Sequence, residues 1–130
     1  WLGTAGARLD DLLVWLPCRL VALGLPLVAG AAPGAAWHQF RAACRDGAPD
    51  PSPNAGLSQA AYAHAVGVQL GGLNHYAGEP RPKPLLAAGQ PPADAAAVER
   101  MLRLSTRLQL LWLVVALALV TLLSKGLRAA

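Results

Sequence analysis

Charged and aromatic side chains are scarce in this sequence. Only 14% of the 130 residues are charged and 5% are aromatic, whereas 55% are hydrophobic. Leucine, alanine and valine supply most of that hydrophobic content. A soluble globular domain usually carries about 25% charged residues and alternates apolar with polar positions. The shortage of charge therefore argues against a soluble domain and favours a membrane protein.

The motifs of several common enzyme classes are also missing. The sequence has no GxxxxGK[ST] phosphate loop, no GxSxG nucleophile turn and no HExxH zinc motif. Its three histidines, His38, His64 and His75, lack ligand spacing, and His64 fits a packed helix residue better than a catalyst. The two cysteines, Cys18 and Cys44, form no CxxC pair, so they indicate neither a metal site nor redox chemistry.

Two apolar runs free of charge are long enough to suggest membrane segments. The first is Leu20–Trp37 and the second is Leu110–Ser124, and a helix needs about 20 apolar residues to cross the hydrocarbon layer. Pro26 and Pro33 interrupt the first run, so we expect a kinked or broken helix that packs against other helices. The chain starts at Trp1, and charged residues precede the first run, so we expect a segment of a longer protein and no secretory signal.

The net charge of +4 follows the pattern of a membrane protein and does not imply a nucleic-acid partner. Most basic residues lie between the two apolar runs, where positive charge marks a cytoplasmic loop. They are Arg41, Arg45, Arg81, Lys83, Arg100, Arg103 and Arg107. We therefore expect a multi-pass membrane protein, in contact with the lipid bilayer, with residues 38–107 in the cytoplasm.

The predicted fold is an all-α polytopic membrane protein in three parts. Residues 1–37 form a helix that leads into the proline-broken first membrane segment. Residues 38–107 form a cytoplasmic region of helices and Pro- and Gly-rich loops. Residues 108–130 form the last membrane segment and a short basic tail.

Within the central part we expect a turn-rich connector, one alanine-rich helix and a proline-rich loop. The connector is 46–56, the helix is 57–70, and the loop is 79–92. Ala63, Gly67 and Gly71 are spaced four apart, as on helices whose backbones approach closely. Gly71 and Gly72 are predicted to stop this helix. Asp94 is predicted to cap the last helix, which runs on into the second membrane segment.

Two groups of turn formers flank the predicted alanine-rich helix. Ser52, Asn54 and Gly56 precede it, where free N–H groups could hold a phosphate or carboxylate, although simple capping explains the same residues. The second group follows the helix and could equally be a C-cap with polar neighbours. It consists of Gly71, Gly72, Asn74, His75 and Tyr76.

Two further sets of charged residues each leave two interpretations open. Asp10 and Asp11 could bind Mg²⁺ or act on an amine, or they could be solvated charges near a helix end. Arg100, Arg103 and Arg107 share one helix face and could contact lipid headgroups or an anionic substrate.

Three ordered stretches of the sequence resemble a known family. The run ARLDDLLVWLPCRLVAL is followed by RDGAPDPSPNAG and then by AHAVGVQLGGLNHYAG. In this order and at this separation they resemble the C-terminal portion of adenosylcobinamide-phosphate synthase, the CbiB/CobD family of cobalamin biosynthesis. The resemblance covers nearly all of this chain but only the later part of a family member.

This resemblance implies an integral membrane ligase that forms an amide bond. The reaction would join a propionate carboxyl of adenosylcobyric acid to 1-amino-2-propanol or its O-phosphate, with ATP and Mg²⁺ required. Other late cobalamin enzymes could assemble with it at the membrane. A non-catalytic scaffold for those enzymes and a corrinoid transporter subunit remain the alternatives.

The resemblance also assigns site residues by motif. Asp10, Asp11 and Asn54 are the predicted catalytic residues, and the two aspartates are the predicted Mg²⁺ ligands. The predicted substrate-binding residues are Arg8, Arg19, Ser52, Gly56, Gly71, Gly72, Asn74 and Tyr76. Ser52, Asn54 and the N–H groups around Gly56 would hold phosphate or propionate oxygens.

Overall fold

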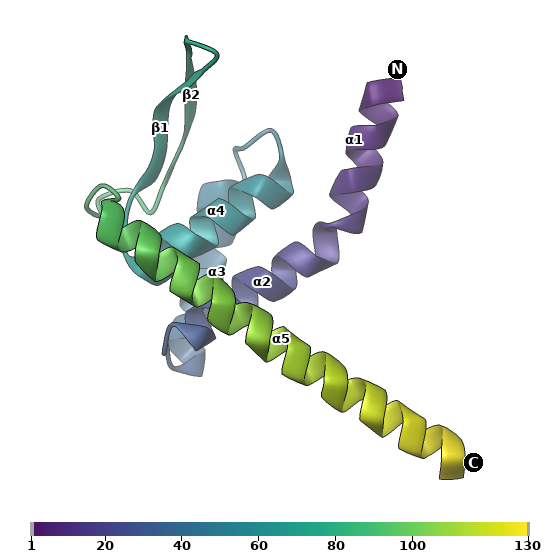
Figure 1. Ribbon diagram of the computed structural model, residues 1–130. Helices are drawn as coiled ribbons and strands as arrows, with labels where there is room; N and C mark the ends of the chain where they lie inside the picture. The colour runs from purple at the N-terminus through teal and green to yellow at the C-terminus, as the bar shows by residue number, and fades with distance from the viewer. Residues whose placement is uncertain (1, 130) are drawn as a thin grey trace.

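The computed structural model describes residues 2–129, and most of them are helical (Figure 1). Three helices, α2, α3 and α4, pack together, and α5 crosses α2 and α4. The remaining elements project from this bundle. In chain order the elements are α1 (Leu2–Leu13), α2 (Trp15–Val28), α3 (Pro33–Gly47), α4 (Pro53–Val66), β1 (Leu70–Tyr76), β2 (Glu79–Leu86) and α5 (Ala95–Ala129).

A bend separates α1 from α2. The axes of Thr4–Leu13 and Trp15–Val28 differ in direction by 43°. Pro17 explains the bend, because a proline ring lacks an N–H group and clashes with the carbonyl four residues earlier, here that of Leu13. The bend directs α1 away from the bundle, as Figure 1 shows.

The first apolar run is divided between two helices. Helix α2 ends at Val28, Gly30 adopts a positive φ of 93°, and Pro33 begins α3. The predicted break is therefore present. However, α2 and α3 pack against each other, so Leu20–Trp37 does not form one straight span. A first membrane segment stays a prediction, although the bent α1–α2 pair is together long and apolar enough to be one.

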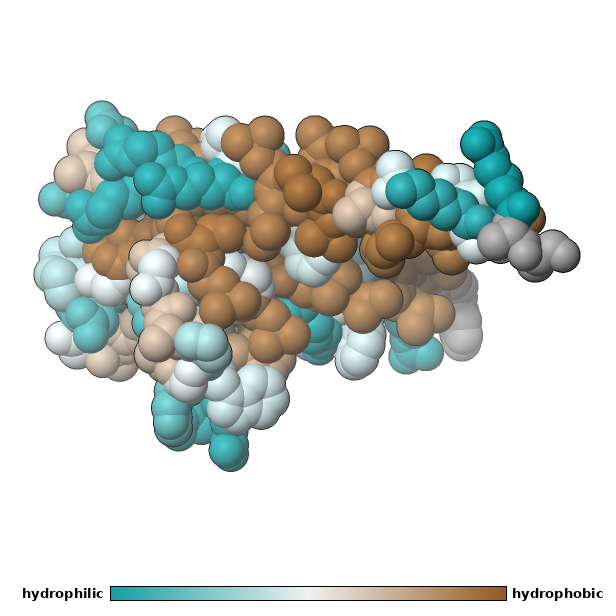
Figure 2. All heavy atoms as spheres, turned by 90° about the horizontal axis from the view of Figure 1, so that it is seen from below, coloured by the Kyte–Doolittle hydropathy of each residue, from teal (hydrophilic) through white to brown (hydrophobic). Residues whose placement is uncertain are grey.

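Helix α5 confirms the prediction for the end of the chain. The Asp94 carboxylate accepts a hydrogen bond from the Ala97 backbone N–H at 2.7 Å, which caps the helix start. The helix then continues without interruption, and its Ala95–Arg128 portion is long and apolar enough to cross a membrane. Its hydrophobic side chains are exposed beyond the bundle (Figure 2). The predicted boundaries at 37/38 and 107/108 fall inside α3 and α5.

The structure corrects the predicted all-α fold, because β1 and β2 form an antiparallel two-stranded sheet. Residues 79–92 were expected to form a loop because of their prolines. The prolines of β2 occupy alternate positions, at Pro80, Pro82 and Pro84. A strand with period two can therefore place all missing N–H groups on one edge and still pair with its neighbour through the other.

The alanine-rich helix also ends earlier than predicted. Gly67, and not Gly71 or Gly72, is its C-cap, with a left-handed φ of 72°. The N–H groups of Gly67 and Val68 both bond to the carbonyl of Ala63, which closes the helix end. Ala63, Gly67 and Gly71 consequently do not share one helix face.

The bundle core is built from small side chains. Ala22, Ala43, Ala60 and Ala63 are completely buried, and small residues allow helix backbones to approach closely. The closest approach joins the end of α3 to the start of α4. A Cβ atom added at Gly56 would collide with the Gly47 carbonyl and lie 2.7 Å from the Asp50 Cβ.

This packing generates a prediction for Gly56→Ala. The added methyl group meets backbone atoms that cannot turn aside, so the substitution should destabilise the protein by about 1–3 kcal/mol. Gly34→Ala is the matched control, because Gly34 is helical and has nothing within 4 Å of its added Cβ. Thermal unfolding in detergent micelles would show a lower Tm for Gly56→Ala only. Equal Tm values for the two variants would contradict the packing argument.

One ion pair joins the sheet to the loop between α3 and α4. The Lys83 ammonium donates to Asp50 Oδ2 at 2.8 Å, and only 4% of the Asp50 side chain is exposed. The hydrogen bond from Lys83 holds the pKa of Asp50 below its usual value, and a second bond from the Ser52 N–H acts in the same direction. The hydrogen bond to Asp50 raises the pKa of Lys83.

This ion pair predicts a pH-dependent contribution to stability. Because the folded pKa of Asp50 is lowered, the contribution is complete above the unfolded value of 3.8 and is lost as pH falls through the folded pKa. Lys83→Met should lower the Tm at neutral pH. The difference in Tm between this variant and wild type should shrink in acid. The exposed Arg81 of the same strand supplies the control variant, Arg81→Met. A difference in Tm between Lys83→Met and wild type that stayed constant down to strongly acidic pH would show that the ion pair makes no such contribution.

Candidate functional site

The start of α4 forms where the sequence places its capping signals. Ser52 is the N-cap, and its hydroxyl accepts a bond from the Ala55 N–H at 3.5 Å. Pro53 occupies the first helical position, where a missing N–H has no cost. The next residue, Asn54, is buried, with 6% of its surface exposed. Its side chain is thereby directed back from the helix start toward α1 and α2.

The Asn54 amide joins an acidic group to a basic group. Its Nδ2 donates to the Asp11 carbonyl at 2.8 Å and to Asp11 Oδ1 at 3.2 Å. Its Oδ1 accepts a bond from Arg19 Nη1 at 2.5 Å. The donor and acceptor ends of the amide thus each face a partner of the right kind. The consecutive helices α1 and α2 thus meet the start of α4, which is distant from them in the sequence, at this side chain.

Two further residues hold this arrangement from the α2 side. The Arg19 guanidinium lies 4.5 Å from the centre of the Trp15 ring and also donates to the Trp15 carbonyl at 3.2 Å. The Cys18 thiol donates to the Asn54 backbone carbonyl at 3.1 Å. Sequence analysis missed Trp15 and Cys18. The spacing of Trp15 and Arg19, four residues apart on one helix, was the available signal.

A pocket of about 350 Å³ opens beside this network. Its polar lining includes Asp10, Asp11, Ser52, Asn54 and Ser58, and its apolar lining includes Val14, Pro17 and Val21. Ser52 Oγ contacts Asp11 Oδ1 at 3.5 Å. Among the described residues, the other carboxylate oxygen of Asp11 has no hydrogen-bond partner, so it is available to a ligand in the pocket.

The residues present fit a Mg²⁺ ion only with help from a substrate. No group of three or more His, Cys, Asp or Glu side chains within residues 2–129 could hold a metal ion. Asp10 and Asp11 supply two carboxylates in one pocket. Mg²⁺ commonly binds one or two carboxylates together with water and substrate phosphates. The pair therefore matches that mode of binding and does not form a complete protein cage.

Three backbone N–H groups at the start of α4 already have acceptors. The Ser52 N–H bonds to Asp50 Oδ1 at 2.9 Å, the Ala55 N–H bonds to Ser52 Oγ, and the Gly56 N–H bonds to the Ser52 carbonyl. Gly56 itself is packed against Gly47, away from the pocket lining. These three amides are therefore already occupied and not free to bind oxygen atoms of a ligand.

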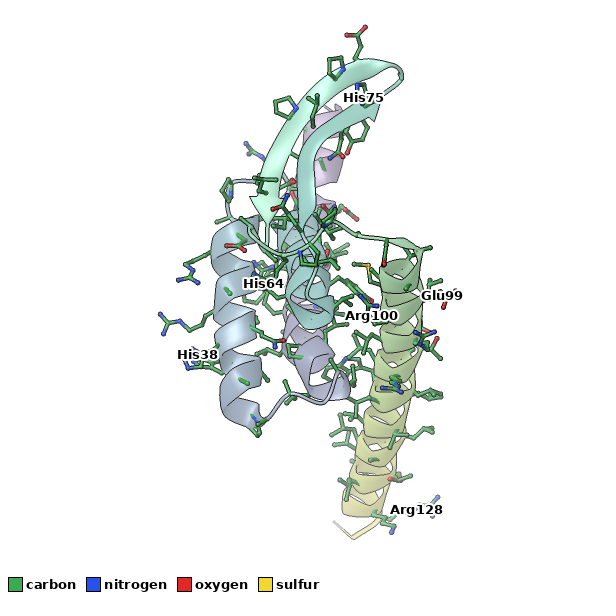
Figure 3. The ribbon with its side chains drawn as sticks, turned by 90° about the vertical axis from the view of Figure 1, so that its left-hand side faces the viewer. His38, His64, His75, Glu99, Arg100 and Arg128 are labelled. Atoms are coloured by element: carbon green, nitrogen blue, oxygen red, sulfur yellow. The ribbon has the colours of Figure 1, made fainter. Side chains whose placement is uncertain are left out.

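The other predicted site residues lie apart from the Asn54 network. Arg8 is exposed on α1 and does not line the pocket. The register of the sheet shifts between Leu70 and Gly72, and a Cβ atom at Gly71 would collide with the Pro84 carbonyl. Asn74 pairs with Arg81, and Tyr76 pairs with Glu79 near the turn. Except for Arg8, all of these residues belong to the β1–β2 hairpin. The hairpin projects from the bundle, as the position of His75 shows (Figure 3).

A second polar cluster joins α3, α4 and the end of β2. His64 Nε2 lies 2.8 Å from Asp46 Oδ2, and the same oxygen accepts the Ala87 N–H at 3.0 Å. The packed, hydrogen-bonded interpretation of His64 agrees with this contact. Sequence analysis missed Asp46 as its partner, because the two residues are joined only by the packing of two helices.

Comparison with known proteins places the chain in a family. Residues 1–105 match the family described as CobD/Cbib protein. Cobalamin biosynthesis protein CobD of Synechocystis sp. is 42% identical over 96% of this chain and 35% of the relative. The CobD protein of Geobacter metallireducens is 39% identical over 94% of this chain and 38% of the relative. Cobalamin biosynthesis protein CbiB of Salmonella typhimurium is 36% identical over 95% of this chain and 37% of the relative.

This chain thus spans somewhat more than a third of the length of these relatives. No solved structure matches it. The family match includes the α1–α2 bend, the Asn54 network and the hairpin, and it stops within α5. The chain belongs to the CobD/CbiB family of cobalamin biosynthesis proteins.

Proposed function

We propose that this chain carries part of the active site of an amide-forming ligase of cobalamin biosynthesis. The supporting observation is that Asp11 and Arg19 of the first motif meet Asn54 of the second motif beside one pocket. The proposed reaction joins adenosylcobyric acid to 1-amino-2-propanol or its O-phosphate, with ATP consumed. The proposed location is the bacterial inner membrane, with residues 38–107 on the cytoplasmic side.

The pocket size favours the small amine as its occupant. A volume of about 350 Å³ accommodates an aminopropanol or its phosphate, whereas a corrin macrocycle is far larger and would remain outside with only its propionate arm near the opening. The valine and proline side chains of the pocket would contact the methyl group of the amine. The carboxylates of Asp10 and Asp11 would attract the ammonium group.

The proposed chemistry requires a free amine and an activated acid. Transfer of a phosphoryl or adenylyl group from ATP to the propionate oxygen would produce a good leaving group. The amine nitrogen would then attack the carbonyl carbon, so that a C–N bond forms, the C–O bond to the leaving group breaks, and phosphate or AMP departs. Asp10 or Asp11 would accept the proton that the nitrogen loses. Mg²⁺ held by these carboxylates would neutralise charge on the phosphates.

The remaining residues of the network would position these groups. Asn54 fixes one oxygen of Asp11 and leaves the other oxygen for the substrate. Arg19 donates to the same amide and, among the described residues, forms no ion pair with Asp11. The Arg19 positive charge would also attract the propionate or its phosphorylated form. In this proposal Asn54 acts through Asp11 and Arg19 and is a positioning residue.

The first test measures amide formation by membranes that contain the full gene product carrying this segment. Mass spectrometry would detect the product from adenosylcobyric acid, the amine or its phosphate, ATP and Mg²⁺. Asn54→Ala should lower kcat/KM for the amine about 100-fold, because small misplacements of reacting groups have effects of that size. The KM for the corrinoid should change little. Gln59→Ala, at an exposed position of the same helix, is the matched control.

Each result has a defined meaning. Equal activity of Asn54→Ala and wild type, at matched protein level and Tm, would show that the Asn54 network takes no part in the reaction. Absence of product from folded, inserted wild-type protein would contradict the ligase. Corrinoid flux across vesicles without amide formation would instead identify a transporter, and activity of other late enzymes that depends on this protein would identify a scaffold.

A further inference from the structure

Three arginines on one side of α5 line a pocket that the proposed reaction does not use. Arg100, Arg103 and Arg107 lie against the ends of two other helices, and the pocket volume is about 200 Å³. Arg100 lies toward α4, whereas the neighbouring Glu99 points away from the bundle (Figure 3). The remaining lining residues are Ala29, Ala65, Val66 and Leu104. The walls are therefore small and apolar, and the positive charge comes from one helix.

Most of this positive charge has no partner within the protein. Arg103 contacts Glu99 at 3.4 Å, but both side chains are largely exposed, with 61% and 69% of their surfaces accessible. Such exposed pairs contribute little. In the described part of the chain, Arg100 and Arg107 have no ion pair or side-chain hydrogen bond. Val66 ends α4 and Ala29 caps α2, so helix C-termini offset only part of the charge.

The position of the pocket along α5 identifies the ligand. Arg107 is the last charged residue before an uncharged stretch, 108–124, which ends at Lys125. At 1.5 Å per residue this stretch is about 26 Å long, close to the roughly 30 Å hydrocarbon layer. Its leucine and valine side chains are exposed in the structure, as at Leu113, Leu117 and Val120. With this stretch in the lipid layer, Arg107 lies at the depth of the lipid phosphates.

We propose that Arg100, Arg103 and Arg107 bind the phosphate of an anionic phospholipid where α5 enters the membrane. Guanidinium groups bind phosphate oxygens in paired hydrogen bonds, and the three are spaced over two turns of one helix. Ala29, Ala65 and Val66 leave room for the headgroup beside them. This proposal depends on α5 crossing the membrane and is independent of the ligase reaction.

The test uses the chain purified in detergent and native mass spectrometry with added phosphatidylglycerol or phosphatidylcholine. Wild type should retain phosphatidylglycerol at least ten times more strongly than phosphatidylcholine of the same acyl length. Arg100→Gln with Arg107→Gln should abolish this preference. Arg41→Gln with Arg45→Gln removes the same charge from the exposed surface of α3 and should preserve the preference.

Two additional measurements separate the alternatives. Inorganic phosphate should raise the Tm of wild type no more than that of the Gln double variant. If phosphate raised the Tm of wild type only, and wild type showed no preference for phosphatidylglycerol, the pocket would be a free phosphate site and the proposal would be overturned. A Gln double variant that unfolds is replaced by Arg100→Lys with Arg107→Lys, which keeps the charge but loses paired hydrogen bonds. This variant should bind phosphatidylglycerol more weakly. Unchanged preference in either folded variant would refute the proposal.

Discussion

The hydrogen bonds of one buried amide join α1, α2 and α4. Asn54 is almost fully buried, and a buried amide is stable only when its donors and acceptor have partners. Asp11 and Arg19 supply those partners from the end of α1 and from α2. The same contact explains why α1, which otherwise packs only against its neighbour α2, has a defined direction. The candidate pocket lies beside this junction, and Asp11 and Asn54 are among its lining residues.

Features of this fold that depend on neighbouring residues could be predicted from the sequence. Asp94 caps α5 as expected, because an N-cap acts on N–H groups only three residues away. The break within the first apolar run is likewise present, because Pro33 acts on the local backbone and begins a new helix. Ser52 caps α4, in agreement with the capping interpretation of this turn, although the helix begins at Pro53 and not at the predicted Leu57. In the candidate site, the motifs that resembled the family contained Asp11, Arg19 and Asn54.

Features that depend on distant residues could not be predicted. The prolines of β2 indicated a loop, and their compatibility with a strand depends on which edge faces β1. The sequence could not show that α2 and α3 pack side by side, because an apolar run fits both a span and a helical hairpin. The pairs Lys83–Asp50 and His64–Asp46 arise only after the helices and strands have assembled. Gly56 was predicted to lie in a turn. Its close packing against the Gly47 backbone, which leaves no room for a side chain, depends on the tertiary structure.

The close contact between Gly47 and Gly56 has a consequence for ligand binding. It joins the two ends of the short segment that contains Asp50 and Ser52, and hydrogen bonds within that segment fix its interior. A flexible loop would lose conformational entropy on binding, and this loss would weaken affinity. Here the polar groups at the start of α4 are already ordered by the protein itself. A small ligand in the candidate pocket would therefore lose little binding free energy to ordering of this segment. Which ligand binds would depend on its shape and charge more than on loop closure.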